Sequence, residues 1–519
     1  MLTDTKSYRI NPEEVLPFHN GVDYCVGSGR MGLALQQAYQ EQLALVQREI
    51  GFKHIRGHGL FSDDMAIFQA SRDDSGRLSV VYNFTYLDMV MDSYIRLHIE
   101  PFLELGFMPA KLASGSQTIF YWKGHTTPPS DYTAWAQLIT ATLEHLMERY
   151  GRDRVVDWPV EVWNEPNLAG FWQDADQAAY FKLFAVSFRA IKAVDSRFKV
   201  GGPAVCGGSD EIWIRAFLDF CQTNRLNPDF ITRHHYNTDV PETSGHYGYA
   251  NLTEAAIGLA NLHTTRTIVD AYPAYKGLPI HLTEFNTSYI PNCPLHDSIR
   301  NAAYLAQQLS RLGDDHVSYS YWTFGDIFEE NGVPFTPFHG GFGLVANGCI
   351  PKPTFWVFRF YKLLQGAKLL HRAADSLFMR RSDDCYCGIV WNLSLQGPAA
   401  PASLHFEIPL SQSSEYCLLT QTVDEHHANP LKVWHDLGEP ASLSATQLQL
   451  LRQTAVPGIR TRTLQPERGP LQLEFSLGSN AVIYFELTPV RLKPDPGYDY
   501  DRAVAGRGRD LTVANGSQT

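Results

Sequence analysis

Two glutamates that lie far apart in the chain each stand where an apolar run ends. Residues 160–163 read Val-Glu-Val-Trp, which has the two-residue period of a β-strand, and Glu165 follows directly. Pro166 cannot donate to a strand ladder, so the strand is expected to stop there. Glu284 closes a second apolar run, residues 278–283. Two carboxylates at two strand ends that face one cleft are the groups required to cleave a glycosidic bond.

The distance between the two carboxyl groups decides the stereochemical outcome of such a reaction. A retaining enzyme holds them about 5–5.5 Å apart, so that one attacks the anomeric carbon while the other protonates the leaving oxygen. An inverting enzyme holds them roughly 6.5–9.5 Å apart and admits a water molecule between them. Both geometries stay open until the strands that carry the acids are placed in space.

Short strands and longer helices alternate from about residue 29 to residue 324. Strands are expected at residues 52–59, 78–84, 102–107, 160–163, 198–202, 229–234, 279–283 and 317–324. Helices are expected at residues 29–49, 86–100, 132–150, 176–194, 210–224, 253–271 and 298–312. Eight strands in this alternation predict an α/β fold, a closed (β/α)8 TIM barrel whose catalytic groups lie at the carboxyl ends of the strands. Glu165 then ends the fourth strand and Glu284 the seventh, and their tips face each other across the barrel mouth.

Changes in composition and in the pattern of apolar residues divide the chain into four parts. Residues 1–25 are expected to add a strand to an accessory β-domain, and residues 26–353 form the catalytic barrel. Residues 354–492 begin with one helix-like piece and continue as short alternating runs separated by turn residues, which predicts mainly an antiparallel β-sandwich with a structural role. Residues 493–519 are rich in Gly, Asp and Arg and are expected to be flexible or packed on a partner.

Composition excludes several classes of function. The formal net charge of −12 repels phosphate backbones, so nucleic-acid binding is not expected. Hydrophobic residues make up 44% and charged residues 19%, as in ordinary globular proteins. No apolar run reaches the length of a membrane span, and residues 1–14 lack the apolar core of a signal peptide, so we expect a cytoplasmic protein without membrane contact. The sequence leaves a homo-oligomer open.

The cysteines favour neither a metal site nor a disulfide. Eight are spread over the chain, and Cys385 and Cys387 are the close pair. One intervening residue places both on the same face of a strand, which is the spacing of neither a zinc site nor a bridge. Reduced thiols are therefore expected.

The contexts of the two glutamates resemble those of a known family. The stretches Trp163-Asn164-Glu165-Pro166-Asn167 and Thr283-Glu284-Phe285-Asn286 are similar to retaining (β/α)8 glycosidases whose acid/base follows an Asn on strand four and whose nucleophile ends strand seven. Within that clan the chain resembles family 39 of the glycoside hydrolases, in its β-xylosidase branch. Further stretches carry the resemblance over most of the barrel: Ile55-Arg56-Gly57-His58-Gly59, Tyr82-Asn83-Phe84-Thr85-Tyr86, Glu104-Leu105-Gly106-Phe107-Met108-Pro109, His234-His235-Tyr236 and Tyr321-Trp322-Thr323-Phe324.

The resemblance implies roles for the residues around the acids. Glu165 would be the general acid/base, with a pKa raised by burial and by the nearby negative charge, and Glu284 the ionised nucleophile. Asn164 would hydrogen-bond the sugar 2-hydroxyl, and Tyr236 would orient Glu284. The remaining implied contacts are sugar hydroxyls for His58 and His234, apolar walls from Phe171 and Trp322, and hydroxyl acceptors at the closed end of the pocket from Glu329 and Glu330.

Glu104 and a set of four histidines each allow a second interpretation. Glu104 lies within an apolar strand and could be catalytic, but a buried ion pair with Arg56 explains it equally well and is the preferred interpretation. The histidines 54, 58, 234 and 235 could form a metal cluster. Their spacing is not that of a ligand set, so sugar-binding or core positions are preferred.

The leading hypothesis is a retaining exo-β-1,4-xylosidase that releases xylose from the non-reducing ends of xylo-oligosaccharides, a step in xylan degradation. No metal or organic cofactor is expected, because both steps use carboxylates and water. An α-L-iduronidase or an arabinosidase-type enzyme of the same family is the nearest alternative, although a uronate would require a cation beside the acids. A noncatalytic sugar-binding barrel and a metal-dependent hydrolase are alternatives from other classes.

Overall fold

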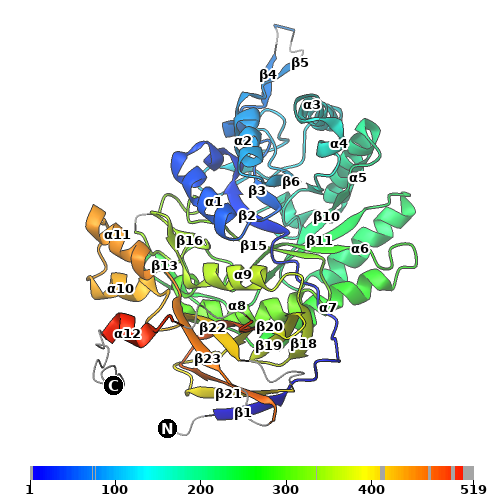
Figure 1. Ribbon diagram of the computed structural model, residues 1–519. Coiled ribbons are helices and arrows are strands. Elements are labelled where there is room, and N and C mark those ends of the chain that lie inside the picture. The colour runs from blue at the N-terminus through cyan, green and yellow to red at the C-terminus, as the bar shows by residue number, and fades with distance from the viewer. Residues whose placement is uncertain are drawn as a thin grey trace, which may run out of the picture.

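The structure, a computed structural model, describes residues 4–72, 74–75, 78–334, 336–409, 415–465, 469–491 and 497–505. Its centre is a closed barrel of eight strands that pair in parallel (Figure 1). In chain order these strands are β2 (Cys25–Arg30), β3 (His54–His58), β6 (Glu100–Leu105), β9 (Val160–Val162), β10 (Val200–Val205), β11 (Phe230–Tyr236), β14 (Ile280–Asn286) and β15 (Ser318–Tyr321). The (β/α)8 barrel predicted from the sequence is confirmed.

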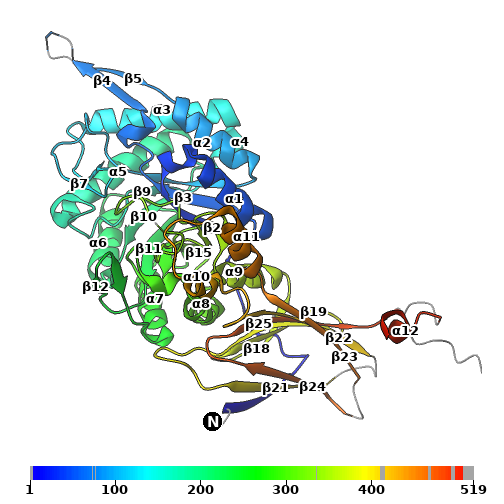
Figure 2. The same ribbon diagram turned by 90° about the vertical axis from the view of Figure 1, so that its left-hand side faces the viewer.

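The first strands of the barrel differ from the expectation. β5 (Leu78–Tyr82), expected as a barrel strand, instead pairs antiparallel with β4 (Phe68–Arg72) in a hairpin that projects from the barrel (Figure 2). The expectation misses β2, because its sequence Cys-Val-Gly-Ser-Gly-Arg contains two glycines and no apolar alternation. Gly27 is required there, since a Cβ would lie 2.4 Å from the Trp322 ring. One strand is missed and one is added, so the numbering of the fourth and seventh strands is unaffected.

Helices cover the outside of the barrel (Figures 1 and 2). Side chains cap several of them, as where Asp131 accepts hydrogen bonds from the amides of Thr133 and Ala134 at the start of α3. Residues 29–36, expected as part of a helix, belong to β2 and a 3₁₀ turn. The barrel helices are α1 (Gln37–Glu49), α2 (Thr85–Arg96), α3 (Tyr132–Tyr150), α4 (Arg152–Val155), α5 (Gln177–Val194), α6 (Asp210–Thr223), α7 (Ala255–Asp270), α8 (Ile299–Leu312) and α9 (Pro353–Leu363).

Shorter elements decorate the loops. The 3₁₀ helices are Met31–Leu35, Asp63–Met65, Gln173–Ala175 and Pro294–Asp297. The short strand pairs are β7 (Thr118–Ile119) with β8 (Gly124–His125), β12 (Glu242–Ser244) with β13 (Tyr247–Tyr249), and β16 (Val345–Ala346) with β17 (Ile350–Pro351). The β12–β13 hairpin follows the sixth barrel strand, and β16–β17 follow the eighth, so both lie on loops that leave the carboxyl ends of strands.

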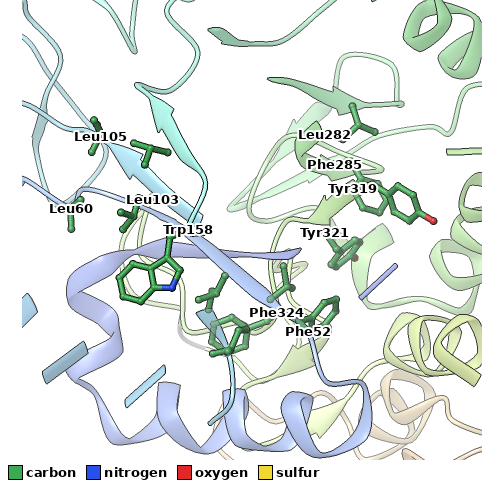
Figure 3. Close-up of a cluster of buried hydrophobic side chains, with 14 of the residues drawn as sticks. Phe52, Leu60, Leu103, Leu105, Trp158, Leu282, Phe285, Tyr319, Tyr321 and Phe324 are labelled. Carbon is green, nitrogen blue, oxygen red and sulfur yellow. The ribbon is translucent and has the colours of Figure 1, made fainter. Parts of the chain in front are cut away.

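One continuous hydrophobic core joins the strands to the helices. Figure 3 shows part of it, with Leu103 and Trp158 on one side of the view and Leu282, Phe285 and Tyr319 on the other. All five side chains are buried. Truncating one fully buried aromatic side chain costs about 3–5 kcal/mol, so this packing fixes the strands that carry the two acids.

The accessory domain packs two sheets face to face (Figure 2). One contains β1 (Asp4–Arg9), β21 (Ala402–Ile408) and β24 (Leu471–Leu477). The other contains β18 (Lys368–Arg372), β19 (Ser376–Ser382), β20 (Cys385–Trp391), β22 (Tyr416–Val423), β23 (Gly458–Leu464) and β25 (Val482–Pro489). The ladders are antiparallel except that β1 pairs in parallel with β21. The accessory sheets confirm the predicted fold class.

Two features of this domain stand apart from its sheets. Helices α10 (Pro430–Asp436) and α11 (Ala445–Thr454) are inserted between β22 and β23 and pack on the barrel loop that contains Phe338 and Ile350. The expectation for residues 493–519 falls largely outside the described residues, of which 497–505 include the helix α12 (Tyr500–Ala505).

The structure also bears on the cysteines and on membrane-spanning helices. All eight cysteines are free, as expected. Within the described part of the chain, no helix combines the length and apolarity required to cross a membrane.

Candidate active site

The two glutamates meet at the carboxyl ends of β9 and β14. One carboxyl oxygen of Glu165, one of Glu284 and a ring nitrogen of His234 all lie within 4.8 Å of one another. His234 Nδ1 is 2.8 Å from Glu165 Oε1 and 3.4 Å from Glu284 Oε2. The side chains of both acids are nearly buried, with 8% and 5% of their surfaces exposed. The fourth and seventh strands therefore bring the two carboxyl groups into one small space.

The backbone around Glu165 is held in an unusual conformation. Trp163 and Glu165 have φ angles of 73° and 43°, in the left-handed region that non-glycine residues rarely adopt. Such residues cost about 1–3 kcal/mol each and occur at functional sites that the surrounding structure fixes. The Glu165 amide donates to the Ala204 carbonyl at 3.1 Å, and the Trp163 indole donates to the Phe171 carbonyl at 2.9 Å. These contacts aim the Glu165 carboxyl toward His234.

Burial sets the protonation of the Glu165–His234 contact. Burial, followed by the charge of Glu284, raises the pKa of Glu165 well above its usual range. Burial, followed by the positive charge of Arg56, lowers the pKa of His234 well below its usual range. These opposite shifts favour a proton on the Glu165 carboxyl group over one on the His234 imidazole, which is the protonation state that a general acid requires.

Two donors hold the Glu284 carboxylate. Arg56 Nη1 donates to Oε1 at 2.8 Å, and the Tyr236 hydroxyl donates to Oε2 at 2.7 Å. Although burial opposes its charge, neighbouring carboxylates raise the pKa of Arg56, so the guanidinium stays positive. A fixed cation and a phenol on opposite oxygens give the carboxyl group a defined orientation. This is the arrangement that a carboxylate nucleophile requires.

Arg56 is the centre of a buried network beneath the acids. It also contacts Glu161 Oε2 at 2.5 Å, Glu104 Oε2 at 2.9 Å and Asn164 Oδ1 at 2.9 Å. The preferred interpretation of Glu104 as the partner of Arg56 is confirmed. The sequence interpretation does not place Arg56 or Glu161 beside the acid pair, although Glu161 stands out as a charged residue between two valines in β9.

His58 and Trp322 form one side of the space above the acids. His58 Nδ1 lies 2.6 Å from Glu104 Oε2, and its Nε2 lies 3.5 Å from Glu284 Oε1. The His58 ring lies 4.7 Å from the Trp322 ring, which is 2% exposed. His58 therefore has one nitrogen tied to the buried network and the other directed at the acid pair.

Aromatic rings form a second side. Phe171 is half-buried and packs edge to face on Phe120, with ring centroids 5.3 Å apart. Phe120 also stacks on His58 at 6.1 Å. The sequence interpretation names Phe171 and omits Phe120, which lies in the aromatic run Phe-Tyr-Trp at residues 120–122.

Glu329 and Glu330 occupy different settings. Glu329 forms an ion pair with Arg30 at 2.7 Å, and Arg30 is also paired with Asp64. Glu330 Oε1 lies 4.0 Å from His58 Nε2, on the side of the acid pair. Burial, followed by the charge of Glu284, raises the pKa of Glu330 well above its usual range. Of the two, only Glu330 thus faces the space above the acids.

The histidine cluster considered as a metal site does not assemble in the described residues. The group of potential ligands found there is Glu165, His234 and Glu284. His54 begins β3, at the end opposite His58, and packs on Tyr24. Two of these three groups are the acid pair itself, and the third, His234, is hydrogen-bonded to Glu165.

Comparisons with known proteins agree with this geometry. A sequence profile described as Glycosyl hydrolases family 39 matches residues 9–472. A β-xylosidase from Geobacillus stearothermophilus is 45% identical over 91% of this chain and 94% of its own. A β-xylosidase from Caldicellulosiruptor saccharolyticus is 35% identical over 89% and 92%. The crystal structure of a monomeric β-xylosidase from Caulobacter crescentus superimposes with a TM-score of 0.83 at 31% identity and covers 93% of this chain and 100% of that one.

Proposed function

This chain belongs to glycosyl hydrolase family 39, and on that premise we propose that it is a retaining exo-β-1,4-xylosidase that releases xylose from the non-reducing ends of xylo-oligosaccharides. The spacing of the two acids carries the proposal. One carboxyl oxygen of Glu165 lies within 4.8 Å of one carboxyl oxygen of Glu284, a close approach that supports the roughly 5–5.5 Å between carboxyl groups of a retaining enzyme over the roughly 6.5–9.5 Å of an inverting one.

The reaction proceeds in two displacements. In the first, the Glu284 carboxylate attacks the anomeric carbon and forms a glycosyl ester, while the bond to the leaving oxygen breaks and Glu165 protonates that oxygen. In the second, Glu165, now a carboxylate, takes a proton from water, and the water oxygen attacks the same carbon. The ester bond then breaks, and Glu284 leaves as a carboxylate. Both acids end the cycle as they began it.

The contacts of each neighbour suggest its part in this reaction. Asn164 accepts from Arg56 through its oxygen, which leaves its amide nitrogen as the donor for the sugar 2-hydroxyl. His58 and Glu330 contact hydroxyls, and Phe171 and Trp322 supply apolar faces for the ring. His234 contacts Glu165 through Nδ1, which also lies 3.4 Å from Glu284, so this ring orients the acid at the floor of the site.

A neutral sugar fits the charges of the site better than a uronate. A C5 carboxylate requires a cation that is free to pair with it. Arg56 is already paired with buried acids, and Arg30 is paired with Glu329 and Asp64. A uronate would therefore meet the carboxyl groups of Glu284 and Glu330 without compensation, which disfavours the iduronidase alternative.

The proposal is tested with aryl glycosides. The protein should hydrolyse an aryl β-xyloside and release β-xylose first, as followed by proton NMR, and Glu284→Ala should abolish turnover while the variant remains folded. Initial release of α-xylose, or turnover retained by Glu284→Ala, would remove the retaining mechanism. Faster cleavage of an aryl arabinoside or iduronide would reassign the sugar. Binding of xylobiose with no turnover of any glycoside would identify a noncatalytic barrel.

A further inference from the structure

The chain leaves the barrel sheet before it reaches Glu165. On one side of β9, the ladder with β10 ends where Glu161 pairs with Gly201. On the other side, the ladder with β6 ends where Val162 pairs with Leu105. Within the part of the chain that the structure describes, no regular strand pairing continues beyond these points. The position of Glu165 therefore depends on irregular contacts.

Three hydrogen bonds tie this segment to the end of β10 instead. The Glu165 amide donates to the Ala204 carbonyl at 3.1 Å. Two residues farther along, Asn167 Nδ2 donates to the Cys206 carbonyl at 3.0 Å, and Asn167 Oδ1 accepts from the Cys206 amide at 3.2 Å. We call this reciprocal pair of bonds between Asn167 and Cys206 the Asn167 clamp. It repeats the exchange of two bonds that facing residues make in an antiparallel ladder.

The chemistry of asparagine fits the clamp. Pro166 has no backbone N–H, so the main chain at that position cannot continue the pairing with β10. A side-chain amide carries both a donor and an acceptor, as a peptide group does. Asn167 is half-buried and uses both atoms on one backbone residue. Aspartate would keep the acceptor and lose the donor, and alanine would lose both.

The backbone of Cys206 is also held from the side of α6. Ser209, directly before this helix, donates through Oγ to the Cys206 carbonyl at 2.8 Å. Gly207 and Gly208 lie between them with φ angles of 69° and 71°, a conformation that glycine adopts without strain. The Cys206 carbonyl thus accepts from Asn167 and from Ser209, which anchors the clamp to the start of a barrel helix.

The clamp also reaches the Glu165 carboxyl group. Asn167 Nδ2 lies 3.9 Å from the sulfur of Cys206 as well as 3.0 Å from its carbonyl. Burial and the charge of Glu284 raise the pKa of Glu165, and a hydrogen bond from the Cys206 thiol opposes this rise. A shift of Cys206 would therefore act on Glu165 at its backbone, through Ala204, and at its carboxyl group, through the thiol.

We propose that Asn167 is a positioning residue for the general acid, because its clamp on Cys206 fixes the turn that directs the Glu165 carboxyl group at the leaving oxygen. The inference rests on the proposed function, in which Glu165 protonates that oxygen. The side-chain amide of Asn167 is committed to Cys206, so it acts through Glu165 and not by contact with the sugar. A general acid must lie within hydrogen-bond reach of the atom that it protonates, and a displacement of about 1 Å can cost about 100-fold in rate.

Asn167→Ala tests this role through the dependence on the leaving group. The value of kcat/KM reports the first displacement, in which a poor leaving group requires the proton and a good one departs without it. The substrates are a dinitrophenyl β-xyloside, which has a good leaving group, and phenyl β-xyloside and xylobiose, which have poor ones. The matched control is Asn392→Ala. Asn392 is also half-buried, and its Nδ2 donates to the carbonyls of Ala400 and Gly478 at 2.8 and 3.0 Å, in the accessory domain.

Asn167→Ala should lower kcat/KM roughly 10- to 100-fold for phenyl xyloside and xylobiose, and less than about threefold for the dinitrophenyl xyloside. With the dinitrophenyl xyloside, kcat and KM should fall together, because the second displacement needs Glu165 as a base and the glycosyl ester then accumulates. Asn392→Ala should match wild type on all three substrates.

Ser209→Ala gives a second test of the same link, and it decides the matter if circular dichroism shows that Asn167→Ala does not fold. It removes the other donor to the Cys206 carbonyl and should lower kcat/KM about two- to fivefold on the poor leaving groups alone.

Two results would overturn the inference and leave the proposed function standing. One is an equal loss of kcat/KM on all three substrates, which would place the effect in the fold or in sugar binding. The other is wild-type kinetics in folded Asn167→Ala, or in Ser209→Ala where that variant decides. If the wild-type protein hydrolyses no xyloside, the proposed function fails, and the role of Asn167 fails with it.

Discussion

Tyr236→Phe should slow the second displacement more than the first. The phenol donates to Glu284 Oε2 at 2.7 Å, while Arg56 holds the other oxygen at 2.8 Å. Phenylalanine keeps the ring and its packing near Phe342 and removes only the donor. In the second step Glu284 leaves as an anion, so the lost hydrogen bond is one that strengthens as negative charge returns.

The expected loss follows from the strength of that contact. A hydrogen bond to a charged group contributes about 1.5–3 kcal/mol, which corresponds to a fall in kcat of roughly 10- to 150-fold. With an aryl xyloside that has a good leaving group, the glycosyl ester should accumulate. The assay is stopped-flow detection of the released phenol, which should show a burst of about one equivalent per enzyme followed by a slow steady state, with a lowered KM.

The matched control is Tyr275→Phe. Tyr275 is buried and donates to the Leu226 carbonyl at 3.0 Å, away from both acids, so this change should leave the kinetics at wild-type values. A Tyr236→Phe variant with kcat within twofold of wild type, or with a large loss but neither a burst nor a lowered KM, would refute the assignment of this hydrogen bond to the departure of Glu284.

The remaining predictions concern the acid, the buried lysine and metals. Because burial and the Glu284 charge raise the pKa of Glu165, kcat/KM should fall only as pH rises through that raised pKa. With a substrate that has a good leaving group, Glu165→Ala should show no fall of kcat/KM at high pH. With poor leaving groups it should lose most of its activity, and azide should partly restore the activity. An equal loss of activity on all leaving groups would contradict the acid role. Lys352→Met leaves two buried aspartates unpaired and should lower the free energy of unfolding by about 3–5 kcal/mol in urea titrations. Lys432→Met, in an exposed pair, should cost less than about 0.5 kcal/mol, and equal losses would contradict this reasoning. Dialysis against a chelator should leave xyloside hydrolysis unaltered, and loss restored by a divalent cation would reopen the metal-dependent alternative.

Periodicity predicts most of the barrel but not its first strand. The strands that end near Glu165 and Glu284 show the two-residue period of a strand, Val-Glu-Val in β9 and Ile-His-Leu-Thr-Glu-Phe-Asn in β14. β2 does not show a strand pattern, because the close approach of the Trp322 ring requires glycine at position 27, where an apolar side chain would otherwise stand. β5 shows a strand pattern yet lies in a projecting hairpin, because strand propensity does not specify a partner.

The sequence by itself determined which residue types could do the chemistry and in which elements they lie. Two local patterns can be read from the sequence alone. One is an acid that follows Asn at the end of a strand, and the other is a second acid at the end of another strand. Only the tertiary structure decided the distance between the acids, the protonation of Glu165 beside His234, and the separation of Glu329 from Glu330. Each of these depends on burial and on charges contributed by strands and loops far apart along the chain, and electrostatic energy depends on distance in space.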